Sequence, residues 1–300
     1  MTVAWVFPGQ GSQKLGMGND LAASAAGRER FALASELLGR DLAAICNGTA
    51  DGELTDLNDT RNTQPALFVV ESLLADGLLA QGRRPDLLAG HSLGELVALY
   101  AGGVIDAATG LALVIERSSL MAAAGGGAMT AVMGFDRSEL EALVAASEGV
   151  VVANDNSEAQ VVLSGRPEAV SAVSGQLRCK RAVPLAVSGA FHSPFMAEAA
   201  ARFGERLDSI PFADSLAPVL SNTDPTPSRD GSTLKKRLQR QMTTGVRWRE
   251  TMVALGEAGC TTVVEVGPGT VLSGLVRRSL DGITTAQVAS LEDLGLDPAA

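Results

Sequence analysis

The sequence predicts an α/β protein in which a hydrolase-like large domain with a parallel sheet carries an inserted ferredoxin-like small domain. Short β-rich runs alternate with segments of helical periodicity on both sides of the middle of the chain, which is typical of a parallel sheet with crossover helices. Between them, the order strand, helix, strand, strand, helix, strand is the ferredoxin-like arrangement. We therefore assign residues 1–126 and 191–300 to the large domain and residues 127–190 to the insert.

The first segment of the large domain begins with a short strand that stops at Pro8-Gly9, a dipeptide typical of a loop. Apolar residues then recur at helical spacing before and after a second short strand. The predicted elements are the strands Thr2–Phe7 and Asp86–Ala89 and the helices Asn62–Gln81, Glu95–Ala101 and Ala107–Ala124.

Gly125-Gly126-Gly127 interrupts this alternation and opens the insert. An insert that leaves and rejoins a larger domain creates a cleft at the crossing points, where small-molecule sites usually form. In the insert we predict the strands Ala128–Gly134, Val150–Ala153, Gln160–Ser164 and Ala182–Val187 and the helices Arg137–Ser147 and Pro167–Arg178; after it, the strands Ala217–Leu220 and Thr261–Glu265 and the helix Thr270–Leu280.

Composition excludes several classes of protein. An apolar share of 46% and a charged share of 19% over 300 residues indicate a folded chain, and a net charge of -10 argues against nucleic acid as the main partner. Cys46, Cys179 and Cys260 are odd in number and show no paired spacing, so we expect neither disulfides nor zinc. With no signal peptide and no apolar run long enough to span a membrane, the prediction is a cytoplasmic protein without membrane contact.

Gly90-His91-Ser92-Leu93-Gly94 matches G-x-S-x-G between a predicted strand and a predicted helix. Glycines at both ends allow the sharp turn that exposes a serine hydroxyl at a helix N-terminus. The alternative is an ordinary glycine-rich turn, which does not explain why a serine flanked by apolar residues lies at the end of a strand. We therefore predict Ser92 as a nucleophile.

A serine hydroxyl needs a base, and the chain has two histidines. His91 precedes Ser92 on the tight turn and is expected to pack beneath it, because neighbouring side chains there point apart. His192, where the insert rejoins the large domain, is the remaining candidate and is predicted to be the base. No Asp or Glu occupies a position that the sequence identifies as the partner of His192. A backbone carbonyl can orient a histidine equally well.

Other charged and glycine-rich segments have two interpretations each. Arg117 is either a surface arginine of an amphipathic helix or a guanidinium that binds a substrate carboxylate. The glycines of Gly9-Gln10-Gly11 either form a plain turn or let backbone N–H groups approach a ligand. Basic residues could steer an acidic partner or simply be solvated; they are Lys235, Lys236, Arg237, Arg240, Arg178, Lys180 and Arg181.

Taken together, the motifs resemble the malonyl-CoA:acyl carrier protein transacylase family, including free-standing acyltransferases that serve polyketide synthases in trans. The similar segments follow the order of the family and span nearly the whole chain. They are Phe7–Gln13, Thr63–Leu67, Gly90–Glu95, Arg117 before Leu120-Met121, Gln160–Gly165, Ala190–Ser193 and Glu265–Gly269.

The resemblance implies a role for individual residues. It implies Ser92 as nucleophile, His192 as base and the main-chain carbonyl of Gln241 as the group that orients His192. It further implies the backbone N–H groups of Gln10 and Leu93 as the oxyanion hole. The resemblance implies that Arg117 binds the malonyl carboxylate and that Gln64 and Phe191 also contact the substrate. A phenylalanine at the position of Phe191 is typical of family members that prefer malonyl over methylmalonyl groups.

The implied activity is transfer of a malonyl group from malonyl-CoA, through malonyl-Ser92, to the phosphopantetheine thiol of an acyl carrier protein. No bound cofactor or metal is expected, and the family suggests a monomer. Polyketide and fatty acid synthesis both remain open as the pathway. The alternatives are an acyl-carrier-protein acyl hydrolase of the same fold, an inactive docking subunit and a generic lipase or esterase; the last fits poorly with an aromatic share of 4%.

Overall fold

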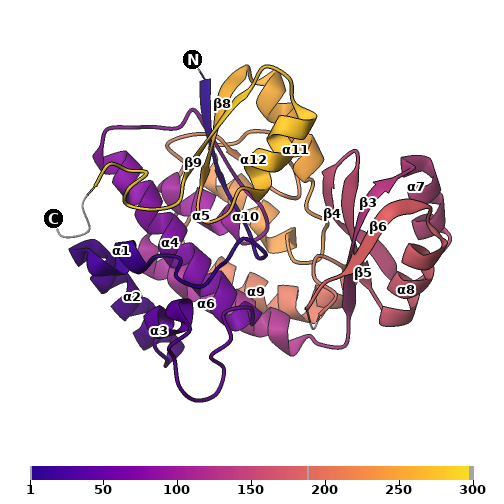
Figure 1. Cartoon of the computed structure of the whole chain (residues 1–300), viewed down its shortest axis with the longest axis horizontal. Helices are drawn as coiled ribbons and strands as arrows, with labels where there is room; N and C mark the ends of the chain where they lie inside the picture. The colour runs from indigo at the N-terminus through magenta and orange to yellow at the C-terminus, as the bar shows by residue number, and fades with distance from the viewer. Residues whose placement is uncertain (1, 188, 297–300) are drawn as a thin grey trace.

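The computed structural model describes residues 2–187 and 189–296 and contains two separate sheets (Figure 1). The central sheet has five strands in the order β7-β2-β1-β8-β9, and every neighbouring pair is parallel. This arrangement confirms the α/β class. The strands are β1 (Thr2–Phe7), β2 (Leu87–Gly90), β7 (Val219–Leu220), β8 (Cys260–Val266) and β9 (Thr284–Val288).

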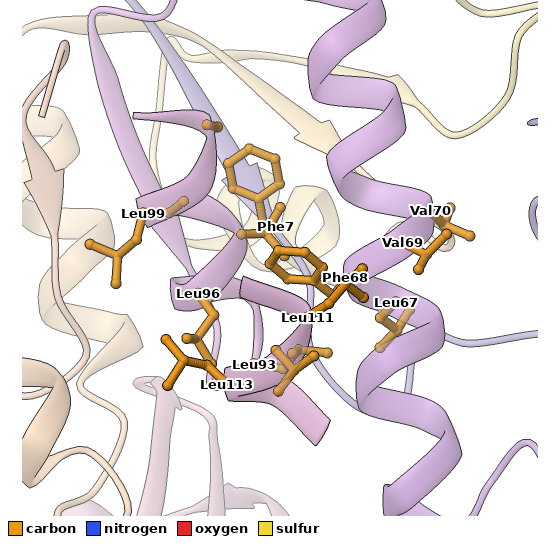
Figure 2. Packing of buried hydrophobic residues seen from close by; sticks show 14 of the residues in the cluster. Phe7, Leu67, Phe68, Val69, Val70, Leu93, Leu96, Leu99, Leu111 and Leu113 are labelled. Carbon is orange, nitrogen blue, oxygen red and sulfur yellow. The ribbon is translucent and has the colours of Figure 1, made fainter. Parts of the chain in front are cut away.

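Both faces of the central sheet are buried, as expected of parallel strands. Side chains of β1 alternate between two hydrophobic clusters: Trp5 and Phe7 belong to one, and Ala4 and Val6 to the other. On the first face, Phe7 lies near Phe68 of helix α4 (Figure 2). A Cβ at Gly110 would lie 2.2 Å from the ring of Phe68, so a residue without a side chain lets the neighbouring helix approach.

Helices cover each face of the sheet. Buried residues of the first cluster come from α1 (Asn19–Ala23), α2 (Ala25–Leu38), α3 (Leu42–Asn47), α4 (Thr60–Ala80), α5 (Gly94–Ala101), α6 (Ala107–Ala123), α9 (Ala197–Asp208) and α10 (Gly231–Arg240), with a 3-10 turn at Pro194–Met196. The second cluster is covered by α11 (Trp248–Glu257) and α12 (Val271–Ser279).

The small sheet is antiparallel, in the order β4-β5-β3-β6, and lies at one end of the molecule (Figure 1). Two helices, α7 (Arg137–Ala145) and α8 (Pro167–Gln176), complete a core of its own. This strand order is that of a ferredoxin-like fold, as predicted. Its strands are β3 (Ala128–Phe135), β4 (Val150–Ser157), β5 (Gln160–Gly165) and β6 (Cys179–Pro184).

The chain leaves for the small sheet and returns from it side by side, because Gly125 and Gly189 form an antiparallel bridge. A Cβ at Gly127 would lie 2.2 Å from the backbone nitrogen of Ala190, which excludes larger residues from this crossing. The domain limits at 126/127 and 190/191 stay a prediction that these contacts support.

Several elements were not predicted from the sequence: α1 to α3, α9 to α11 and the edge strand β9. The strand predicted at Ala182–Val187 is also displaced, since β6 begins and ends earlier, at Cys179 and Pro184. β9 alternates exposed and half-buried residues, so it lacks the apolar run of the central strands. Helices α1 and α3 are too short to give a periodic signal, whereas α9 and α10 carry a clear apolar stripe that the sequence analysis overlooked.

We expected no apolar segment long enough to span a membrane, and this was wrong as far as the length and composition of one helix are concerned. Within the described residues one helix, α4, meets both criteria, and 78% of its apolar window is buried inside the protein. It packs between α2, α5 and α6, as a core helix does.

Candidate active site

Ser92 lies on a sharp turn between β2 and α5. Its φ of 54° is in the left-handed region, which a residue with a side chain rarely adopts and which clusters at functional sites. A Cβ at Gly90 would lie 1.9 Å from the backbone of Gly94, and one at Gly94 would lie 2.1 Å from the carbonyl oxygen of Phe7. The two glycines of the motif are therefore required by close backbone contacts.

His192 meets Ser92 although 100 residues separate them. The Nε2 atom is 2.7 Å from Ser92 Oγ, and Nδ1 is 2.9 Å from the main-chain oxygen of Gln241. Because a carbonyl can only accept, Nδ1 carries the proton and Nε2 is free to receive one. Burial and the nearby Arg117 cation lower the pKa of His192 to about 3, so the imidazole is neutral near pH 7.

Arg117 is fully buried, which excludes the surface interpretation. Its guanidinium donates to Gln64 Oε1 at 2.6 Å, to Gln241 Oε1 at 2.8 Å and to Ser92 Oγ at 3.2 Å. Burial lowers the pKa of Arg117 to about 10, which still leaves it protonated at neutral pH. A cation that contacts neutral amides and a hydroxyl is ready to bind an anion next to Ser92.

A buried network beneath the turn was missed from the sequence. Asn222 accepts from the Ser92 backbone N–H at 2.7 Å and donates to the Gly90 carbonyl at 2.6 Å. The Gln241 side chain donates to Glu95 Oε2 at 2.7 Å and to the Ser92 carbonyl at 2.8 Å. Gln241 thus fixes the turn and Arg117 with its side chain and His192 with its backbone. Glu95, directly after the G-x-S-x-G motif, was the available signal.

The side chain of His91, which was expected to pack beneath the turn, reaches the small sheet and also borders the cavity that contains Ser92. Its Nε2 atom is 2.9 Å from Asn156 Oδ1 of β4, and its ring centroid is 5.6 Å from that of Trp248. The residue before the candidate nucleophile therefore connects the central sheet to the small sheet.

The predicted site residues except Gln241 line one cavity of about 80 Å³. It is lined by Gln10, Gln64, Ser92, Leu93, Arg117, Phe191 and His192, together with His91, Met121, Met129, Asn154, Leu185 and Val187. A second cavity of about 830 Å³ shares Gln10, Val187 and Phe191 with it. A small chamber with a mixed polar and apolar lining therefore adjoins a larger one, with the nucleophile in the small chamber.

The basic clusters are solvated in large part, because Lys236, Arg240, Arg178, Lys180 and Arg181 are exposed, but two of their members are not free. Arg237 is 6% exposed and is paired with Asp224 at 2.7 Å, and Lys235 donates to the main-chain oxygen of Ile210. Both are occupied by contacts within the fold, so this cluster is only partly available to a partner. Arg178 is exposed and contacts Glu139.

Across residues 2–187 and 189–296, no three His, Cys, Asp or Glu side chains gather as a metal site. The cysteines are free, and burial raises the pKa of the Cys46 thiol to about 12.

The chain is similar to several known proteins. The acyl transferase domain family matches residues 4–295. A malonyl CoA-acyl carrier protein transacylase of Synechocystis is 50% identical over 98% of this chain and 99% of its own, and its crystal structure has a TM-score of 0.94. The Escherichia coli K12 transacylase is 40% identical over 94% of each chain.

Polyketide-associated proteins are also similar. The polyketide biosynthesis protein PksE of Bacillus subtilis is 38% identical over 92% of this chain, which corresponds to 36% of PksE. A solved structure shows a type II polyketide synthase acyl-carrier protein in complex with its malonyl-transacylase. One chain of that structure matches this protein with a TM-score of 0.89 and 38% identity, over 98% of each chain. Because the family match spans nearly the whole chain and relatives are 40–50% identical over at least 94% of it, the chain belongs to the acyl transferase domain family.

Proposed function

We propose that this protein transfers a malonyl group from malonyl-CoA to the phosphopantetheine thiol of an acyl carrier protein. The observation that carries the proposal is the contact of Ser92 Oγ with both the His192 imidazole and the Arg117 guanidinium. A nucleophile that touches a base and a buried cation suits an acyl group with a free carboxylate. The names of the similar proteins support the same activity.

In the first half-reaction, His192 Nε2 accepts the Ser92 proton as Oγ attacks the thioester carbonyl. The backbone N–H groups of Gln10 and Leu93 are the proposed donors to the oxyanion; both residues line the cavity beside Ser92. Loss of one such donor typically costs about 10²–10³ in rate. The tetrahedral intermediate collapses, the C–S bond breaks and coenzyme A leaves with the proton from His192.

In the second half-reaction, the carrier thiol gives its proton to His192 and attacks the malonyl ester. The C–O bond to Ser92 breaks, and the proton returns to Oγ. Arg117 holds the malonyl carboxylate throughout, with Gln64 beside it and Phe191 at the mouth of the cavity. One thioester is exchanged for another, so exclusion of water matters more than driving force.

An acyl hydrolase would share Ser92 and His192, and Arg117 favours transfer because short uncharged acyl groups do not need a carboxylate clamp. For its other properties we propose a monomer of the cytoplasm that binds neither nucleic acid nor membrane. The net charge of -10 and the free cysteines support this assignment.

The test is intact-protein mass spectrometry after mixing the enzyme with malonyl-CoA, without carrier protein. We expect a stable malonyl adduct on the wild type, none on Ser92→Ala, and loss of the adduct with formation of malonyl carrier protein when the carrier is added. An adduct that hydrolyses within one turnover would favour the hydrolase, and absence of any adduct would refute the transferase.

A further inference from the structure

The small sheet contributes one polar side chain to the nucleophile cavity that the mechanism above does not use. Asn154 of β4 lines the chamber with Ser92 and Arg117. Its Oδ1 atom is buried and has no hydrogen-bond partner among residues 2–187 and 189–296. A buried amide oxygen without a partner is costly, and native proteins rarely keep one without a reason.

The backbone on each side of Asn154 is fixed to the segment before α11. The Val246 N–H donates to the Ala153 carbonyl at 2.7 Å, and the Asp155 N–H donates to the Val246 carbonyl at 2.9 Å. This segment approaches closely, because a Cβ at Gly245 would lie 2.6 Å from the Val152 carbonyl oxygen. Asn154 is therefore held at a set distance from the central sheet.

Side chains next to Asn154 reinforce this attachment. Asn156, two residues along the strand, contacts His91, the neighbour of Ser92, at 2.9 Å. Asp155 pairs with Arg249 of α11 at 2.9 Å. Asp155 is thus tied to the start of α11 and Asn156 to the turn that carries Ser92, whereas Asn154 is the residue of β4 that lines the cavity.

We propose that Asn154 binds the amide group of the thioester arm next to the sulfur, and so recognises the feature that coenzyme A and the carrier's phosphopantetheine have in common. This inference rests on the proposed function. Arg117 and Gln64, from α6 and α4, take the malonyl carboxylate, and Ser92 takes the thioester carbonyl. The wall formed by Asn154, Leu185 and Val187 then faces the part of the substrate beyond the sulfur.

The chemistry of the side chain matches that ligand. A carboxamide can accept from an amide N–H and donate to an amide carbonyl. Val187 belongs to both cavities, so an arm that passes it continues into the larger chamber. One neutral hydrogen bond of this kind changes kcat/KM by about three- to tenfold.

The experiment compares two malonyl thioesters that differ in one N–H group. One is the thioester of N-acetylcysteamine, and the other is that of 2-mercaptoethyl acetate, in which an ester oxygen replaces the N–H. Acylation of Ser92 is followed by thiol release in the wild type, Asn154→Ala and Leu185→Ala. The ratio of the two kcat/KM values does not depend on the fraction of folded enzyme. A variant that is partly unfolded therefore still gives a valid ratio.

We expect the wild type to prefer the amide by about three- to tenfold, Asn154→Ala to lose this preference, and Leu185→Ala to keep it. Equal losses on both thioesters in Asn154→Ala, or a wild type with no preference, would overturn the role of Asn154 while leaving the transferase intact. Absence of acylation of wild-type Ser92 by either thioester would instead refute the proposed function itself.

Discussion

The guanidinium of Arg117 lies 3.2 Å from Ser92 Oγ, which in turn lies 2.7 Å from His192 Nε2. A buried cation this close selects an acyl group with a carboxylate, and it also disfavours a second positive charge on the imidazole. Substrate choice and base strength therefore depend on the same residue.

Replacing Arg117 with Ala should lower malonyl transfer by about 10²–10⁴-fold, because up to two charge-assisted hydrogen bonds are lost. Transfer of acetyl, which has no carboxylate, should fall far less. The measurement is kcat/KM for malonyl-CoA and acetyl-CoA with the same carrier protein. Equal losses on the two substrates would remove Arg117 from the acyl site.

The same variant should change the pH dependence of acetyl transfer. Burial and the Arg117 cation lower the pKa of His192 to about 3. Without the cation the pKa rises, and the neutral base is then lost at a higher pH. The acid limb of the kcat/KM profile for acetyl-CoA should therefore move upward in Arg117→Ala, and an unchanged limb would contradict the electrostatic coupling.

At the scale of single elements, helix α4 carries a carboxyl group in an unfavourable place. Glu71 is fully buried, and neither oxygen has a partner among the described residues. Burial, with the nearby Glu265 carboxylate as a second cause, raises the pKa of Glu71 well above its usual value. Glu265 itself accepts from the Leu272 and Ser273 N–H groups at the start of α12. Burial and the neighbouring carboxyl group therefore favour the protonated form of Glu71.

A carboxyl group with a raised pKa in the folded state holds a proton that unfolding releases. Its contribution to stability is present below the unfolded pKa and is lost as pH rises toward the folded pKa, by up to about 1.4 kcal/mol per pH unit. Glu71→Gln, which keeps the shape and cannot ionise, should therefore gain stability relative to the wild type from pH 5 to pH 8. Urea unfolding over this range measures the difference, and parallel pH profiles would show that Glu71 is ionised in the fold.

At the scale of the whole molecule, the position of the small sheet depends on a narrow contact. Val246 bridges to β4, and Gly245 before it leaves no room for a side chain beside Val152. The contact places β4, and with it one wall of the active-site cavity, against the segment before α11. Figure 1 shows β4 as the strand of the small sheet nearest to α11.

Gly245→Ala should destabilise the protein by about 1–3 kcal/mol, as overpacking does, and should also lower malonyl transfer because the cavity wall shifts. Gly175→Ala is the matched control, since a Cβ there meets nothing within 4 Å and α8 gains a better helix former. Thermal unfolding and kcat/KM of both variants check this expectation. If the Gly245→Ala protein is as stable and active as Gly175→Ala, the contact between Gly245 and Val152 does not determine the position of the cavity wall.

The sequence by itself determined the fold class and the reacting groups. Alternating strands and helices, and the βαββαβ order, are local patterns and can be read without coordinates. The G-x-S-x-G turn identifies Ser92 because its glycines are a backbone requirement. His192 followed because the chain has only two histidines.

Tertiary structure alone decided how these groups act together. Whether Arg117 was a surface residue or a buried cation depended on which side chains surround its helix, and periodicity does not report that. The bonds of Asn222, Glu95 and the Gln241 side chain, and the place of Asn154 in the cavity, join residues far apart in the chain. Such contacts depend on packing between elements, whereas a sequence pattern records only the local preferences of each element.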